Sequence, residues 1–291
     1  MTLPVIVGVD GSEAGLWATE WATEEAALHG LPLRIVHASL WERYEGPAFT
    51  DSSEVPAEHA LAEDIVGRAA ERARRRNPGV EISVDILPED AESALLREAH
   101  RATVVVTGSR GRGPITGTLL GSVSRSLATR ALCPVVVVRG SPLNRQGDDG
   151  RVVVGVGDVG ASSAAIRFAF REARSRRWAL EAVRAWRRPA HKPLTHPLLA
   201  GDPAHHHEEQ ALALLDDALR GQAGEHPDVP LHRLAAEGPA HHVLLTHAAT
   251  ADLLVIGAPR RRGPLLGRVA DAALHHADCP VAVIPQCEAA S

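Results

Sequence analysis

Two copies of one pattern occupy this chain. The apolar run Val5–Val9 (VIVGV) returns as Val152–Val156 (VVVGV), an offset of 147 residues (152 − 5). The run Cys133–Val138 (CPVVVV) returns as Cys279–Ile284 (CPVAVI), an offset of 146 residues (279 − 133). Because the same features recur in the same order at nearly constant spacing, the sequence predicts a duplicated domain of about 140 residues.

The domain boundaries follow from this repeat and from a change in composition. The first domain is expected over residues 1–140 and the second over residues 151–286. The segment 141–150 between them is polar, rich in glycine and without hydrophobic periodicity, which is typical of a linker.

Within each copy, short β-branched runs alternate with amphipathic stretches. Strands are predicted near residues 4–9, 33–38, 80–87, 103–107 and 134–138, and again near 151–156, 179–185, 229–235, 252–256 and 280–284. Helices of the first copy are predicted near 13–29, 57–76, 91–101 and 122–131. Continuous apolar strands separated by helices are typical of a parallel sheet covered on both faces. The predicted fold class is therefore α/β, with two tandem open parallel sheets of five strands flanked by helices.

A glycine-rich loop follows the fourth predicted strand. Gly108, Gly111 and Gly121, with Ser122, form the spacing G-x2-G-x9-G-S. In an open parallel sheet, ligands bind beyond the carboxyl ends of the strands, where the strand order reverses. Glycine allows a positive φ and a close approach of the backbone to a ligand, so we expect a ligand to lie against these glycines.

The helix expected after this loop favours a phosphate ligand. Ser122, Val123 and Ser124 open the helix, where free N–H groups and the positive end of the dipole point outward. The serine hydroxyls add donors, and Arg110 and Arg112 add positive charge for a polyphosphate. The alternative is a surface loop with helix-capping serines. The position after a buried strand and the spacing favour phosphate.

Asp10 ends the first predicted strand, in the sequence Val9-Asp10-Gly11-Ser12. One interpretation is that its carboxylate accepts a hydrogen bond from the base or sugar of a nucleotide. The other is that it caps the helix that follows, a role that suits both aspartate and serine. The residues alone leave both interpretations open.

The motifs VGVDGS, G-x2-G-x9-G-S and CPVVVV resemble those of the universal stress protein family in its tandem form. The resemblance implies a Rossmann-like sheet of strand order 3-2-1-4-5 in each copy, and ATP bound to the first copy with Mg²⁺ or Mn²⁺ beside its phosphates. It implies that Asp10 contacts the adenosine and that the backbone near Ala38 meets the adenine. The phosphates would lie on the loop residues Gly108, Gly111, Gly121 and Ser122.

The resemblance also bears on assembly, since members of this family usually pair through their last strands. It implies that the two copies here pair with each other in that way, and it leaves further association into a homodimer open.

The second copy departs from the nucleotide-binding pattern. Gly157 stands at the position of Asp10, and Arg268 at the position of Ser122. Three loop residues are missing, because the offset falls from 149 at Gly257 to 146 at Gly267. We therefore expect the second copy to bind ATP weakly or not at all.

Charge and composition narrow the range of binding partners and cellular locations that are expected for this chain. The formal net charge of −5 argues against general binding to nucleic acid or to anionic membranes. No signal peptide is apparent, and no apolar run approaches the roughly 18 residues of a membrane span. Three cysteines make no disulfide framework, so a reducing, cytoplasmic location is expected.

Several reactive residue types appear without a site around them. Lys192 is the one lysine, and no Walker A loop or G-x-S-x-G elbow is present. The 16 histidines lack the spacing and partners of a metal site, so a solvated surface is expected for them. Cys133 and Cys279 precede buried strands and are expected to be packed thiols.

The expected function is that of an ATP-binding regulator of a stress response. Catalysis of a reaction is not expected. The role in stress is implied by the resemblance alone. One alternative is a slow ATPase or adenylating enzyme, for which Asp10 is the single candidate base. Another is a scaffold that binds no nucleotide.

Overall fold

The computed structural model describes residues 2–40, 57–109, 120–139, 150–157, 162–187, 203–259 and 266–286. The chain divides into two compact units, of which the first ends with strand β5 (Val135–Val138) and the second begins with β6 (Arg151–Gly155). Of the segment interpreted as a linker, only Gly150 lies in the described part. It is buried, and a Cβ there would come within 2.2 Å of the Trp178 ring.

The first unit is built on a five-stranded sheet whose order is β3-β2-β1-β4-β5. Each neighbouring pair in this sheet is parallel. Besides β5, its strands are β1 (Val5–Gly8), β2 (Leu33–Ala38), β3 (Ile82–Leu87) and β4 (Val104–Gly108). This confirms the predicted parallel sheet and the order 3-2-1-4-5. It also places the reversal of strand order between β1 and β4.

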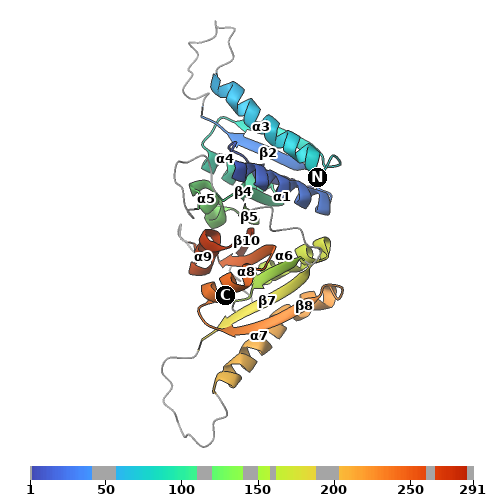
Figure 1. Ribbon diagram of the computed structural model, residues 1–291, viewed down its shortest axis with the longest axis vertical. Coiled ribbons are helices and arrows are strands. Elements are labelled where there is room, and N and C mark those ends of the chain that lie inside the picture. Colours follow the sequence, from blue (N-terminus) through green and yellow to red (C-terminus); the bar gives the residue numbers. More distant parts are fainter. Residues whose placement is uncertain are drawn as a thin grey trace, which may run out of the picture. The chain divides into compact units, whose positions relative to one another are not determined.

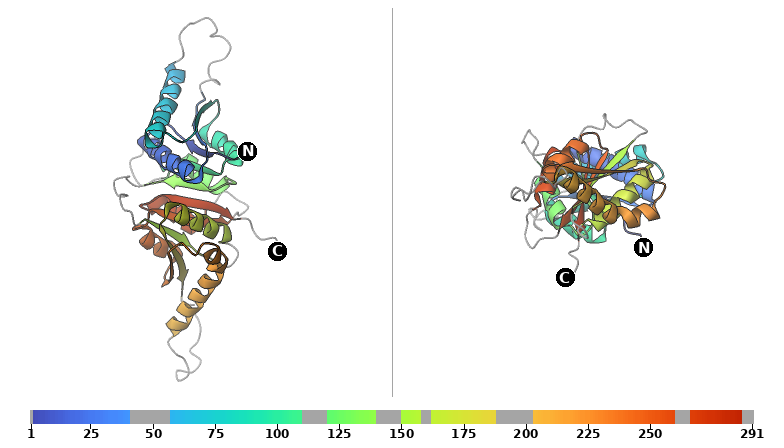
Figure 2. Two further views of the ribbon diagram at one scale, coloured as in Figure 1. Left: turned by 90° about the vertical axis from the view of Figure 1, so that its right-hand side faces the viewer. Right: turned by 90° about the horizontal axis from the view of Figure 1, so that it is seen from below.

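Helices cover both faces of this sheet (Figure 1). One face carries α1 (Glu13–His29) and α3 (Ala57–Arg76), which pack on each other. The other carries α4 (Ala91–Glu98), continued by a 3₁₀ turn, and α5 (Ser122–Arg130). In the left view of Figure 2, the blue α1 and cyan α3 lie on one side of the strands and the teal α4 on the other.

Local sequence explains why these elements begin and end where they do. Val5, Ile6 and Val7 of β1 are fully buried, as a strand covered on both faces requires. Ser12 caps α1, because its Oγ accepts a hydrogen bond from the amide of Gly15 at 3.2 Å. At the other end, Gly30 adopts a left-handed conformation with φ of 62°, which suits glycine.

The second unit repeats this architecture with strand order β8-β7-β6-β9-β10, again with parallel neighbours. Its further strands are β7 (Ala179–Trp186), β8 (Leu231–Glu237), β9 (Leu253–Pro259) and β10 (Val281–Gln286). Its helices are α6 (Ser163–Arg176), α7 (Pro203–Glu225), α8 (Ala240–Ala248) and α9 (Arg268–His276). No helix in the described ranges is long and apolar enough to cross a bilayer.

Cys133 is a packed thiol, as its position before β5 predicts. It is 8% exposed, and burial raises the pKa of its thiol to about 11. Since the thiolate is the reactive form, we expect iodoacetamide at pH 8 to alkylate Cys133 roughly 100-fold more slowly in the folded chain than in urea. Peptide mass spectrometry of timed samples measures this difference. Alkylation of folded Cys133 at the rate of an unfolded thiol would contradict the assigned burial.

Candidate functional site

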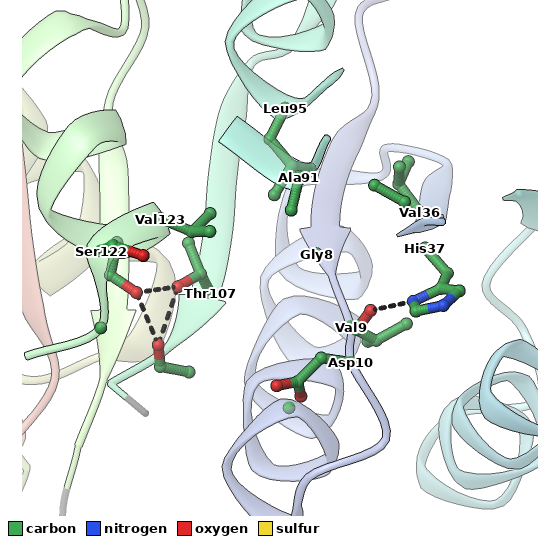
Figure 3. Close-up of a pocket in the computed structure, with 15 residues that line it drawn as sticks. Gly8, Val9, Asp10, Val36, His37, Ala91, Leu95, Thr107, Ser122 and Val123 are labelled. Atoms are coloured by element: carbon green, nitrogen blue, oxygen red, sulfur yellow. Dashed lines mark hydrogen bonds between the residues drawn. The ribbon is translucent and has the colours of Figure 1, made fainter. Parts of the chain in front are cut away.

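A cavity of about 160 Å³ opens at the carboxyl ends of β1, β2 and β4 in the first unit (Figure 3). It lies at the reversal of strand order, where the connections from β1 and β4 leave toward opposite faces of the sheet. The predicted site residues that line it are Asp10, Ala38, Gly108, Gly121, Ser122, Val123 and Ser124. The fold therefore brings together seven residues that are separated by up to 114 positions in the sequence (124 − 10).

Asp10 lines this cavity and also supports the start of α1. Its Oδ1 accepts hydrogen bonds from the amide of Ser12 at 3.0 Å and from the hydroxyl of Ser12 at 2.5 Å. The helix cap itself is Ser12, so the interpretation of Asp10 as the cap is wrong. The two roles considered for Asp10, helix cap and cavity residue, belong to two different residues. Ser12 caps α1, and the carboxylate of Asp10 holds Ser12 while forming part of the cavity wall.

The start of α5 forms the opposite side of the cavity. Gly121 is the N-cap residue and provides no side-chain oxygen to the first turn. In addition, no backbone carbonyl of the described residues accepts a hydrogen bond from the amides of Ser122, Val123 and Ser124. These three donors lie at the positive end of the helix dipole and beside the cavity. Such an arrangement binds phosphate or another anion.

Gly121 is held in place by the preceding strand. Its amide donates to the carbonyl of Ser109 at 3.0 Å, and the amide of Ser109 donates to Val138 of β5 at 3.0 Å. The start of α5 is therefore fixed to the carboxyl ends of β4 and β5, so its first amides are oriented before any ligand arrives.

Gly108 and Gly121 do not use the positive φ that glycine allows. Gly121 has φ of −64° and ψ of 148°, and the described glycines with positive φ do not include Gly108. A Cβ on Gly108 would lie 2.7 Å from the backbone carbonyl of Ala14 in α1. Gly108 is needed so that α1 can pack against the end of β4.

The two serines of α5 also differ in their surroundings. The hydroxyl of Ser124 is buried, donates to the carbonyl of Gly108 at 2.8 Å and lies 2.7 Å from Oγ1 of Thr107. Figure 3 labels Thr107 and draws its hydrogen bonds beside the start of α5. Ser122 is exposed at the rim. We therefore expect Ser124 to offer a ligand its amide and Ser122 to offer both its amide and its hydroxyl.

His37 is a lining residue that the sequence patterns did not single out. Its Nδ1 lies 2.8 Å from the carbonyl oxygen of Val9, next to Asp10 (Figure 3). Because a carbonyl oxygen only accepts, Nδ1 must carry the proton and the ring is held at the end of β2. A polar residue directly after the apolar pair Ile35 and Val36, at the carboxyl end of a predicted strand, was the available signal. Ala38 follows it and lines the same end of the cavity.

Three predicted site residues, Arg110, Gly111 and Arg112, lie outside the described residues. Their part in the site stays a prediction.

Comparison with known proteins agrees with this architecture. The family model described as "Universal stress protein family" matches residues 1–139 and again residues 150–285. This chain belongs to the universal stress protein family. A universal stress protein of Mycolicibacterium smegmatis is 32% identical over 96% of each chain. Universal stress protein Rv1996 of Mycobacterium tuberculosis is 34% identical over 98% of this chain and 96% of its own.

A solved universal stress protein from Archaeoglobus fulgidus shares the fold at lower sequence identity. It covers 98% of each chain with a TM-score of 0.67, and it is 14% identical to this chain. The two matches to the family model make this chain a tandem universal stress protein with two domains of the same fold.

The second universal stress protein domain has a cavity at the corresponding strand ends, with a volume of about 280 Å³. The start of α9 has nearly the same backbone as the start of α5, since Gly267 has φ of −64° and ψ of 154°. The side chains differ. Gly157 replaces Asp10, and Ile256 and Ala270 replace the hydroxyl pair Thr107 and Ser124. The backbone at the start of the helix is thus retained, while these three polar side chains are lost.

Proposed function

We propose that the first domain of this universal stress protein binds ATP, with the phosphates at the start of α5 and the nucleoside across the ends of β1 and β2. The observation that carries this proposal is the set of three consecutive amides, Ser122 to Ser124, without a side-chain cap and beside a cavity. A trianionic or tetra-anionic phosphate tail satisfies donors of this kind better than water does.

The other end of the cavity suits a nucleoside. Val36, Ala38 and Leu95 provide apolar walls, against which a planar base loses contact with water. Asp10 provides a carboxylate acceptor for the hydroxyl or amino groups of the nucleoside. His37 closes the wall beside Asp10. Apolar walls at one end and amide donors at the other match a ligand with a base and a phosphate tail.

Mg²⁺ or Mn²⁺ would accompany the nucleotide. Phosphate oxygens are ligands that such ions prefer, and Mg²⁺ commonly keeps several waters when it binds a nucleotide. In this proposal the phosphates, rather than a dedicated set of side chains, hold the ion.

We propose regulation rather than catalysis as the consequence of binding. Asp10, the one carboxylate of the described lining, already accepts two hydrogen bonds from Ser12, which makes it a poor general base. ATP would favour whichever conformation holds the start of α5 in the observed geometry. Steady ATP turnover that is lost in the Asp10→Ala variant would favour the enzyme instead.

The direct test is to identify the small molecules that leave the purified full-length chain on denaturation, by liquid chromatography and mass spectrometry. We expect an adenine nucleotide in an amount comparable to the protein. A chain that is folded by circular dichroism, retains no nucleotide and takes up no added ATP would refute the proposal and favour the nucleotide-free scaffold.

A further inference from the structure

The cavities of the two domains share the apolar wall that is proposed to hold the base. In the first domain this wall is formed by Val9, Val36, Ala38, Ala91 and Leu95. At the same places in the second domain stand Val156, Val183, Ala185, Ala240 and Leu244. Each of these positions carries the same residue type in both domains. The second cavity, of about 280 Å³, therefore keeps the apolar wall of the first.

The strands place the first part of this wall in the same way in both domains. The amide of Val9 donates to the carbonyl of Val36 at 2.9 Å, and the amide of Val156 donates to the carbonyl of Val183 at 2.9 Å. In each domain the alanine of the wall lies two residues beyond the second valine. The valines and alanines thus agree in position as well as in residue type.

The helices above the strands supply the rest of the wall. Each of α4 and α8 begins with the second alanine of the set, and the leucine follows one helical turn later. A Cβ on Gly8 would lie 2.6 Å from Cδ1 of Leu95, and a Cβ on Gly155 would lie 2.8 Å from Cδ1 of Leu244. Both leucines therefore pack against the end of the central strand through a glycine.

The opposite end of the second cavity has lost the polar groups of the first. Ile256 stands in place of Thr107, so an apolar side chain lies where the first domain has a buried hydroxyl. Gly157 replaces the carboxylate of Asp10. A ribose or a phosphate tail would lose polar partners here, whereas a flat ring would keep its walls.

The two polar side chains of the described lining are engaged within the chain. Nη1 of Arg184 donates to the carbonyl of Gly157 and lies 3.5 Å from the carbonyl oxygen of Val156. Oγ of Ser162 accepts a hydrogen bond from the amide of Gly157 at 2.9 Å. An anion would have to compete with the chain for Arg184, and a cation would meet a like charge. An uncharged ligand avoids both costs.

We propose that the second domain binds a flat, uncharged aromatic heterocycle of purine size against Val183, Ala240 and Leu244, and that it does not bind a nucleotide. This inference rests on the proposed function in one respect, because the first domain identifies this wall as the base end of the cavity. The duplicated scaffold then carries a nucleotide site in one domain and a site for a bare ring in the other.

The test titrates adenine calorimetrically into the full-length Ala91→Leu variant, in which leucine fills the base end of the first cavity. Adenine is uncharged at neutral pH, and purine-6-carboxylate is its anionic match. We expect one adenine per chain, bound at least about tenfold more tightly than the carboxylate, which would have to displace the contacts of Arg184. Equal or tighter binding of the carboxylate, or no saturable binding of adenine, would overturn the proposal.

Two leucine substitutions on α8 locate the bound adenine. Ala240→Leu, added to Ala91→Leu, fills the base end of the second cavity and should lower the adenine affinity at least about tenfold. Ala240→Val should lower it in the same direction with less disturbance of the fold. Thr246→Leu is the matched control and should leave the affinity unchanged, because Thr246 is exposed on the same helix and outside the cavity lining. Equal affinities in the Ala240 and Thr246 variants, each folded by circular dichroism, would refute the location.

The inference and the proposed function fail separately in these experiments. ATP binding to the wild-type chain tests the first domain, and adenine binding to the Ala91→Leu variant tests the second. A chain that binds ATP, but whose Ala91→Leu variant binds no adenine, would keep the proposed function and overturn this inference. Adenine binding to that variant without any ATP binding to the wild type would overturn the proposed function alone.

Discussion

Replacing Gly121 by valine is expected to lower the affinity of the chain for ATP by about 100-fold or more, which corresponds to about 2.7 kcal/mol. A branched side chain at this N-cap position would stand beside the amides of Ser122 to Ser124 and hinder a phosphate from reaching them. The backbone itself tolerates valine, because φ of −64° and ψ of 148° lie in the extended region. Equilibrium dialysis with labelled ATP measures the loss.

Gly267→Val is the matched control for this experiment. Gly267 caps α9 with φ of −64° and ψ of 154°, and a Cβ there meets no atom within 4 Å. The variant therefore carries a similar cost at a helix start but leaves the first cavity untouched, so ATP affinity should stay within about threefold. Equal losses in the two variants would mean that the start of α5 has no special part in binding.

Replacing Gly108 by alanine is expected to lower the free energy of unfolding of the first domain by about 3 kcal/mol. The new methyl group would lie 2.7 Å from the backbone of Ala14, and a helix backbone cannot move aside as a side chain can. For a domain of this size, the loss should lower the melting temperature by roughly 10 °C. Differential scanning calorimetry of the full-length chain measures the shift.

Gly257→Ala tests whether that cost comes from the backbone contact. Gly257 holds the corresponding place in β9, but its Cβ would meet the side chain of Gln286, 2.6 Å from Nε2. Gln286 can change rotamer, so we expect a smaller loss of about 1 kcal/mol. A Gly108→Ala variant as stable as Gly257→Ala would show that α1 can shift away from β4.

Periodicity and repetition were sufficient to predict most of this fold. The predicted helix over 57–76 and the predicted strand over 33–38 coincide with α3 and β2. The helix is long, and the strand buries Leu33, Ile35 and Val36, so local sequence and tertiary burial favour the same structure. The helix expected over 91–101 ends at Glu98 and continues as a 3₁₀ turn. Such ends depend on local hydrogen bonds that a hydrophobic pattern does not specify.

The site was predictable in its position but not in its details. The spacing of glycines and Ser122 located the start of α5, because a strand, a loop and a helix start leave a clear pattern. The contact of Gly108 with Ala14 joins residues 94 positions apart (108 − 14), and no local signal encodes it. The hydroxyl contact of Ser124 with Thr107 was hidden for the same reason.

The two domains also differ in a way that the repeat did not predict. Arg34 of β2 binds Asp85 at 2.6 Å and Glu98 at 2.7 Å. At the corresponding position of β7, Glu181 binds Arg151 at 3.0 Å and His247 at 2.5 Å. Both domains therefore have a polar cluster at this place, with an arginine at its centre in the first domain and a glutamate in the second. The partners of the central residue change with it, so that each central charge meets groups of opposite charge or hydrogen-bonding capacity.

The central claim is that the chain has one nucleotide site, at the start of α5 in its first domain. The most direct measurement is the calorimetric titration of ATP with Mg²⁺ into full-length chain from which bound nucleotide has been removed. We expect one ATP per chain. Two equivalent sites would contradict the proposed loss of function in the second domain, and the absence of any saturable binding would contradict the account of the first.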